Sequence, residues 1–163
     1  MTGKAGAQMQ AQDAGSSVRF RIKNLGFNVT GSLGGLSGRV VFDPGKPEDA
    51  GFDVSVDANT INTDNGMRDD HLRGETYFNV QHYPYIRLVS GKIAPGKKGV
   101  YLFTGQLTIK DHTKEVSFPF TVAEAGGGWR FQGSFTINRK DFDIGGFSTI
   151  SDQLEVTLDV TAK

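Results

Sequence analysis

The chain has 163 residues, and its 18 Lys and Arg are balanced by 18 Asp and Glu, so the formal net charge is zero. This balance excludes binding of nucleic acid or an anionic membrane through overall charge. The absence of cysteine excludes disulfides, a thiolate nucleophile and a cysteine-based zinc site. The length favours one domain, and the 22 glycines and 12 phenylalanines indicate a β fold with an aromatic interior.

The N-terminal residues differ in composition from the rest of the chain. Residues 1–15 are rich in Gly, Ala and Gln and show little periodicity. We therefore predict a flexible tail over 1–15 and a single domain over 16–163. Residues 1–16 also lack the apolar core of a signal peptide, and no apolar run is long enough to span a membrane.

From Ser17 onward, apolar and polar residues alternate in short runs, which predicts β-strands with one buried face. The first run covers 18–22 and continues to 29 beyond a bend at Gly26. Glycines within 31–38 then predict a hairpin turn with bulges. The remaining strands are predicted at 40–42, 52–58, 86–88, 101–109, 116–122, 129–137 and 154–160, with a long loop at 141–151. Eight strands joined by short turns predict an all-β, antiparallel meander that closes into a barrel.

Residues 62–84 interrupt the alternation with charges, amides and a histidine, and then become aromatic. Asp64 or Asn65 can cap a short helix and Gly74 can end it, so we predict a short helical insertion near residues 64–74. We expect the insertion to lie over one end or side of the barrel. Two apolar residues are expected to pack onto the barrel, Leu72 and Phe78. The side chains expected in local polar networks are Arg68, Asp69, His71 and Arg73.

The interior of an eight-stranded barrel can be filled by side chains or can hold one ligand. The alternation is compatible with both a packed phenylalanine core and an apolar cavity. If there is a cavity, its inward-facing residues are the ligand-binding candidates. These candidates are Phe20, Ile22, Phe42, Phe52, Val54, Leu88, Phe103, Leu107, Phe118, Phe120, Phe131, Phe135 and Ile137.

The polar residues form no defined catalytic or metal-binding motif. His71, His82 and His112 lack the spacing of zinc ligands, so no metal and no other cofactor is predicted. No nucleophile elbow is present. His71 with Asp69 or Asp70 could act as an acid and base, but such a cluster on a short helix is more often a solvated, capped face. We therefore predict no catalytic residue.

Several blocks, in order, resemble the YceI-like family. The most specific is an Arg-Asp-x-His-Leu-Arg segment at 68–73, followed by Tyr-Phe-Asn-Val at 77–80 and Tyr-Pro at 83–84. The other similar blocks are 17–27, 42–44, 57–63, 105–110, 113–114 and 137–145. The resemblance covers the chain from about residue 16 to its end. Two positions depart from the family pattern: Asn24 stands where His is usual, and Asp111 stands where Gly is usual.

The resemblance implies a lipocalin-like barrel whose apolar interior binds a long-chain isoprenoid, a quinone-like lipid or another amphiphile. It further implies a carrier or storage protein that is periplasmic or secreted and is not an enzyme. The change at Asn24 puts any role of the usual histidine in doubt. Two other functions stay open. One is a filled-barrel structural or stress-related interaction protein, which could form a homodimer, and the other is an enzyme on a lipid or quinone that uses His71 and Asp69.

Overall fold

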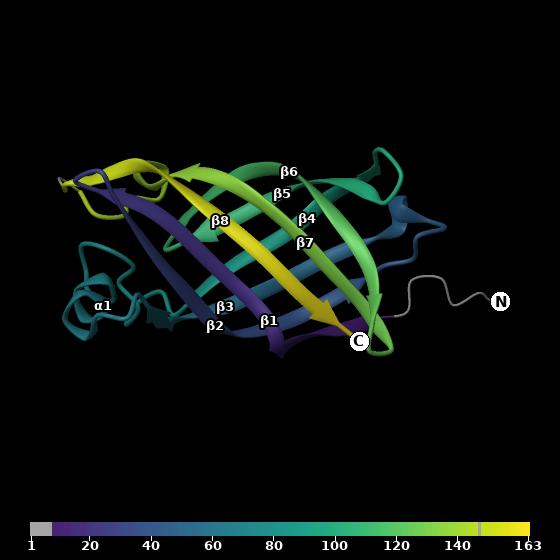
Figure 1. Cartoon of the computed structure of the whole chain (residues 1–163), viewed down its shortest axis with the longest axis horizontal. Helices are drawn as coiled ribbons and strands as arrows, with labels where there is room; N and C mark the ends of the chain where they lie inside the picture. The colour runs from purple at the N-terminus through teal and green to yellow at the C-terminus, as the bar shows by residue number, and fades with distance from the viewer. Residues whose placement is uncertain (1–7, 147) are drawn as a thin grey trace.

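The computed structural model describes residues 8–146 and 148–163, and it confirms the predicted barrel. Eight antiparallel strands pair in sequence order, and β8 returns to pair with β1 (Figure 1). The strands are β1 Gln8–Asn24, β2 Phe27–Val41, β3 Gly51–Asn62, β4 Tyr85–Pro95, β5 Val100–Ile109, β6 His112–Ala125, β7 Gly128–Asn138 and β8 Ile150–Ala162. The helical elements are the 3-10 turns η1 Pro47–Asp49 and η2 Arg139–Phe142 and the helix α1 Gly66–Leu72.

The predicted N-terminal tail is too long, because β1 begins at Gln8. Met9 pairs with Val40 of β2, and Ala11 pairs with Ala162 of β8, so these residues join the sheet on both sides. The pairing of β1 shifts register before Ser17 on both sides, which marks a bulge. A bulged strand of small and polar residues has no clear alternation, so sequence periodicity did not reveal it. Residues 1–7 of the predicted tail lie outside the described residues.

The first hairpin turn also differs from the prediction. Leu25 and Gly26 form a two-residue turn between β1 and β2, with φ angles of 51° and 83°, and Asn24 pairs with Phe27 across it. This is the backbone of a type I′ hairpin, in which both central residues have positive φ. The segment that we predicted to be one strand bent at Gly26 is therefore two strands.

The glycines at 31–38 lie inside β2 and do not form the predicted hairpin turn. The pairing of β2 with β3 shifts register twice in this region, so the glycines accompany bulges within the sheet. At Gly31 there is a steric reason for glycine, because a Cβ would overlap the ring of Phe20 on the neighbouring strand. The other strands keep the predicted alternation, as in β6, where Val116, Phe118 and Phe120 are buried.

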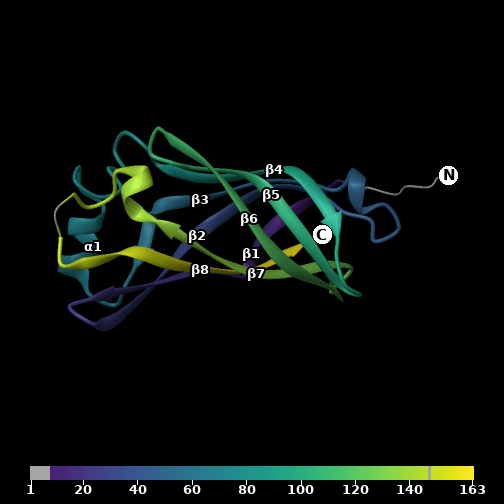
Figure 2. The same cartoon turned by 90° about the horizontal axis from the view of Figure 1, so that it is seen from above.

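The barrel is elongated, and its two ends are built differently (Figures 1 and 2). We call the end that carries α1 the loop end; its connections are 25–26, 63–84, 110–111 and the link between η2 and β8. The opposite end, which we call the plugged end, carries the connections 42–50, 96–99 and 126–127, and the C-terminus lies on that side. The short helix is where the sequence predicts it, and it lies over an end of the barrel. Among the described residues, no helix has the length and apolar character needed to cross a membrane.

Candidate functional site

Aromatic rings fill the barrel at its plugged end. Phe42 lies edge-on to Tyr101 and Trp129, with ring centroids 5.3 and 5.6 Å away. Phe52 lies edge-on to Phe131 at 5.1 Å. Edge-to-face packing of this kind adds stability beyond the burial of area. This half of the barrel is therefore a packed phenylalanine core, which is one of the two kinds of interior that the sequence left open.

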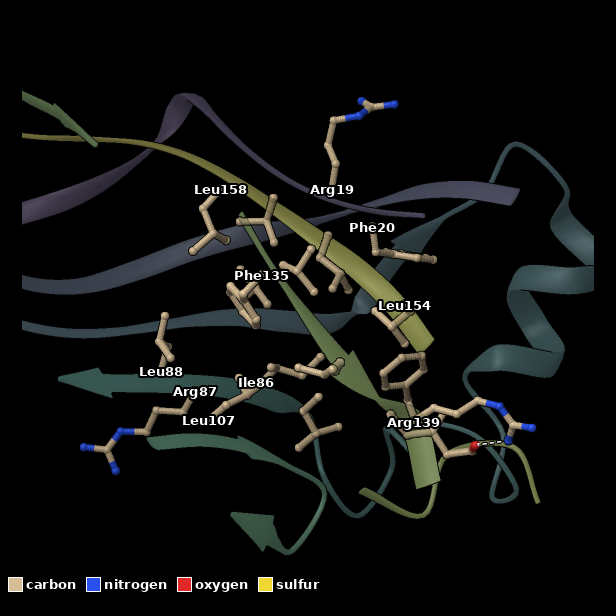
Figure 3. A pocket seen from close by; sticks show the side chains of 18 of the residues that line it. Arg19, Phe20, Ile86, Arg87, Leu88, Leu107, Phe135, Arg139, Leu154 and Leu158 are labelled. Carbon is tan, nitrogen blue, oxygen red and sulfur yellow. Dashed lines mark hydrogen bonds between the residues drawn. The ribbon is translucent and has the colours of Figure 1, made fainter. Parts of the chain in front are cut away.

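The half of the barrel toward the loop end contains a cavity of about 130 Å³ with an almost entirely apolar wall (Figure 3). Its lining follows β8 from Ile150 to Val160, a length of roughly 30 Å at about 3.3 Å per residue. A smaller hollow of about 50 Å³ adjoins it, and the two walls share Val54, Leu88, Leu158 and Val160. One water molecule needs only about 10–15 Å³ of such space. The long cavity is thus suited to a single extended chain.

The predicted ligand-binding residues divide between the two halves of the barrel. The main cavity is lined by Phe20, Ile22, Val54, Leu88, Leu107, Phe135 and Ile137. The small hollow beside the aromatic plug is lined by Phe52, Phe103, Phe118, Phe120 and Phe131, as well as by Val54 and Leu88. Phe42 lines neither space, because its ring is enclosed by other rings at the plugged end. Most of the phenylalanines named from the sequence therefore lie at or near the plug.

Much of the cavity wall is aliphatic and was not among the sequence candidates. The additional strand residues are Val18, Leu33, Leu36, Val56, Ile86, Ile109, Ile150, Leu154, Val156, Leu158 and Val160. Alternation in β8 could have identified four of its five lining residues, those from Leu154 to Val160. By contrast, Leu72, Tyr77, Phe78 and Ile144 belong to the helix and loops of the loop end, where no periodicity marks an inward face. Leu72 and Phe78 thus pack onto the barrel as predicted and also close the cavity.

Charged side chains next to the cavity point away from it. Figure 3 shows Arg19 and Arg87 directed outward from the barrel wall. Arg87 donates two hydrogen bonds to Asp53, at 2.9 and 2.7 Å, and this contact lowers the pKa of the Asp53 carboxyl below its usual value. On the opposite side of the barrel, Arg130 likewise holds Asp159 at 2.8 and 2.6 Å and lowers its pKa. These pairs link neighbouring strands on the outer surface and leave the interior uncharged.

Arg139 is the exception, because it lines the cavity and is only 2% exposed. Its Nε donates to the carbonyl of Ser151 at 3.0 Å, and its Nη1 donates to the carbonyls of Ile144 and Gly146 at 2.8 and 3.1 Å. Its Nη2 faces the Ile150 carbonyl at 3.4 Å and a carboxylate oxygen of Asp152 at 3.5 Å. A guanidinium has five N–H donors, and these five contacts give each donor a partner. Arg139 therefore holds the loop before β8 and leaves no donor free for a ligand.

The helix at the loop end is fixed by an exposed N-cap and by buried and partly buried hydrogen bonds to Thr63. Asn65 caps α1 by accepting a hydrogen bond from the backbone N–H of Arg68 at 3.0 Å. Buried Asp69 accepts from the backbone N–H and the hydroxyl of Thr63, at 2.9 and 2.5 Å. Arg68 donates to the hydroxyl and the carbonyl of the same threonine, both at 2.8 Å. These contacts tie the helix to the end of β3.

The prediction that His71 joins this polar network is wrong. Its exposed ring packs on Tyr77 with centroids 5.0 Å apart, and no hydrogen bond links it to Asp69, whose carboxylate faces Thr63. Arg73 does join the network, through Asp70 and the Asn59 carbonyl at 2.8 and 2.9 Å. Within 8–146 and 148–163, no three His, Asp or Glu side chains lie close enough together to hold a metal. The geometry gives no support to an acid and base pair of His71 and Asp69.

The comparison with known families agrees with this architecture. A sequence model of the YceI-like domain matches residues 9–162. The chain belongs to the YceI-like family. A UPF0312 protein of Shewanella denitrificans is 31% identical to it over 143 residues, which cover 83% of this chain and 75% of that protein.

Solved structures share the YceI-like barrel over nearly its whole length. BcnA of Burkholderia cenocepacia has a TM-score of 0.89 at 28% identity, and the match covers 94% of this chain and 99% of BcnA. A polyisoprenoid binding domain from Saccharophagus degradans has a TM-score of 0.77 and covers 97% of this chain and 98% of its own. Its sequence is 15% identical to this chain, and a likeness at this level shows only that the fold is shared.

Asn24, which we expected from the sequence to depart from the family pattern, links two connections of the loop end. Its side-chain oxygen accepts a hydrogen bond from the Thr149 hydroxyl at 2.5 Å, and the backbone N–H of Leu25 donates to the Thr149 carbonyl at 3.4 Å. Asn24 therefore has a structural contact in this YceI-like barrel, between the first hairpin and the loop before β8. It is not part of the cavity wall.

Proposed function

We propose that the protein binds one long-chain isoprenoid, quinone-like or similar lipid in the barrel cavity, and that it acts as a carrier or storage protein without catalysing a reaction. The observation that carries the proposal is the long apolar cavity. Arg139 lines this cavity as a buried charged side chain, and all its donors are occupied by protein acceptors. Such a wall recognises hydrocarbon and makes no directed contact with a head group.

The energetics of burial favour a long chain. Each buried CH₂ contributes about 0.8 kcal/mol, so a chain with about ten buried methylenes gains roughly 8 kcal/mol. Association itself costs an estimated 4–15 kcal/mol. A short chain would therefore bind weakly without polar anchors, whereas a chain that fills the length of the cavity would bind well. We infer that selection is by chain length and that the polar head lies near the loop end.

The name of one structural neighbour is consistent with the chemical class of this ligand. The structural neighbour from Saccharophagus degradans is named as a polyisoprenoid binding domain, and it has the same fold. The cavity also weighs against the alternative of a completely filled barrel, because only the plugged end is packed. The acid and base pair that an enzyme would need is not assembled at His71.

The proposal can be tested by extracting purified protein with organic solvent and identifying the extract by mass spectrometry. We expect about one equivalent of a long-chain lipid. Val156→Trp should fill the cavity from β8 and abolish this lipid, since Val156 lines the wall. Thr157→Trp is the matched control, because Thr157 is the next residue and faces outward. Recovery of no lipid from wild type, or of equal lipid from both variants, would contradict the proposal.

We also propose that the protein works in the periplasm, a location suggested by its resemblance to the YceI-like family. An aqueous space between two membranes is a setting in which a lipid carrier is useful. Fractionation of cells that express the full-length gene would test this, with the protein expected among the contents released when spheroplasts are made. Its retention with the cytoplasmic fraction would refute the location but not the binding.

A further inference from the structure

Exposed apolar side chains gather at the loop end of the barrel. Of the large hydrophobic residues that are exposed in the described part of the chain, four lie at this end: Leu25 at 72%, Phe27 at 77%, Met67 at 85% and Tyr85 at 62%. Leu102, at 43%, lies near the plugged end. Scattered single exposures would need no explanation. Here they collect at the end where helix and loops, rather than paired strands, close the cavity.

The backbone at Leu25 sharpens this observation. Leu25 occupies the first central position of the type I′ turn, with φ of 51°, where Asn, Asp or Gly is strongly preferred. Leucine at this position is unfavourable for two reasons: its side chain disfavours a positive φ, and its apolar surface is exposed to water. Phe27, directly after the turn, is also exposed. The hairpin tip therefore departs twice from a stable, solvated turn: Leu25 has an unfavourable backbone angle, and two apolar side chains contact water. We infer that the tip has an apolar partner.

The hairpin tip is connected to the residues that close the cavity. Thr149 is bonded to Asn24 and Leu25, as described above, and its neighbour Ser148 lies 3.3 Å from the hydroxyl of Tyr77. Tyr77 lines the cavity. A partner that holds the tip therefore sits next to the loop and the aromatic ring that separate the cavity from the exterior.

We propose that the hairpin tip, residues Leu25–Phe27, inserts into the surface of a lipid bilayer, that Met67 of α1 at the same end also contacts it, and that the loop end of the cavity is thereby placed against the bilayer. This rests on the proposed function, because a bilayer is where a long-chain lipid would be taken up or released. Charges of both signs flank the tip, including Lys23 and the Arg21–Glu155 pair at 3.1 Å. Binding should therefore depend on apolar insertion and change little with salt.

The test is flotation of the full chain with vesicles of phosphatidylcholine, and with vesicles that also contain phosphatidylglycerol. Wild type should float with both. Leu25→Asn combined with Phe27→Thr should lower the partition coefficient at least about tenfold, since each side chain loses its apolar burial. Leu25→Asn also restores the residue that the turn prefers, so the fold is expected to be kept. Leu102→Ser, an exposed apolar residue near the other end, is the control and should float as wild type does.

A second measurement uses the absence of cysteine from the chain. A polarity-sensitive dye attached at Phe27→Cys should shift its emission to the blue on addition of vesicles, and the same dye at Leu102→Cys should not. Failure of wild type to float, equal loss in the control, or dimerisation through the tip without flotation would overturn the docking. Lipid extraction and binding of N-phenyl-1-naphthylamine in solution do not involve vesicles, so they show separately whether the cavity binds lipid at all.

Discussion

Arg139 illustrates how a buried charge can serve structure in a lipid-binding barrel. Its side chain reaches three backbone carbonyls around the start of β8 within 3.1 Å, and its ion pair with Asp152 is long at 3.5 Å. The hydrogen bonds to carbonyls, rather than the ion pair, therefore satisfy the guanidinium. Gly145 is part of the same arrangement, with φ of 89° and a Cβ position 2.9 Å from the Tyr77 ring.

Replacing Arg139 with Met should lower the free energy of unfolding by about 2–4 kcal/mol, because several buried carbonyls lose their donors. Arg130→Met is the matched control. Arg130 is half exposed and binds Asp159 on the outer surface, so its loss should cost no more than about 1 kcal/mol. Urea denaturation monitored by circular dichroism measures both. Equal losses in the two variants would show that the buried carbonyl contacts do not stabilise the fold.

Among the elements, α1 is too short to be stable by itself, and its position depends on its contacts with β3. Asp69 provides the link, because its carboxylate accepts two hydrogen bonds from Thr63 in a buried setting. The neighbouring Asp70 is 82% exposed in its side chain and bonds only to Arg73 among the described residues. The Arg-Asp-x-His-Leu-Arg segment thus has an architectural role at its second position.

Asp69→Ala should therefore lower the free energy of unfolding by about 1–3 kcal/mol, since two donors of Thr63 are left without their acceptor. Asp70→Ala should change it by less than about 1 kcal/mol. Hydrogen exchange should also show faster exchange of α1 amides in the Asp69 variant alone. If the two variants were equally stable, or if Asp69→Ala changed lipid binding without changing exchange, the architectural role would be refuted.

Two arginine–aspartate pairs join strands across the outer surface, β3 to β4 and β7 to β8. Each lowers the folded-state pKa of its aspartate, chiefly through the hydrogen bonds from arginine. An unfolded aspartate has a pKa of about 3.9. A depressed folded pKa contributes stability that is present above about pH 4 and is lost as the pH falls through the folded value.

We therefore expect Asp53→Asn combined with Asp159→Asn to be less stable than wild type at pH 7, by about 0.4–2 kcal/mol for two surface pairs. The difference should shrink as the pH is lowered from 4 toward the folded pKa values, because wild type then loses the same interactions. Urea denaturation at a series of pH values measures this. A difference that stays constant down to pH 2 would contradict the assignment.

For the whole molecule, alternation in the sequence was sufficient to predict the closed barrel and the places of β3 to β8, because each of these strands has one wet and one dry face. The total of eight was right only because two errors cancelled: the first predicted strand is divided at Leu25, and the hairpin predicted at 31–38 lies inside β2. Alternation could not distinguish a filled from a hollow interior, since Phe131 and Phe135 have the same inward orientation on β7. Their different surroundings depend on which side chains of the other strands lie at the same level along the barrel axis. Irregular backbone limited the prediction elsewhere, as at the glycines of β2 and the Leu25 turn, where bulges and positive φ interrupt the period of two.

A barrel that is packed at one end and hollow at the other should respond unequally to the same substitution. Phe131→Ala removes a ring packed on Phe42 and Phe52 at 5.4 and 5.1 Å, and it should cost about 3–5 kcal/mol of stability. Phe20→Ala removes a ring that already faces empty space, so fewer contacts are lost and we expect about 1–2 kcal/mol. The Phe20 variant should also bind more N-phenyl-1-naphthylamine, because its cavity is larger. Delipidated protein is used for both, so that bound lipid does not contribute to the stability of wild type. Equal destabilisation by the two substitutions would mean that the cavity closes around its lining when no ligand is bound.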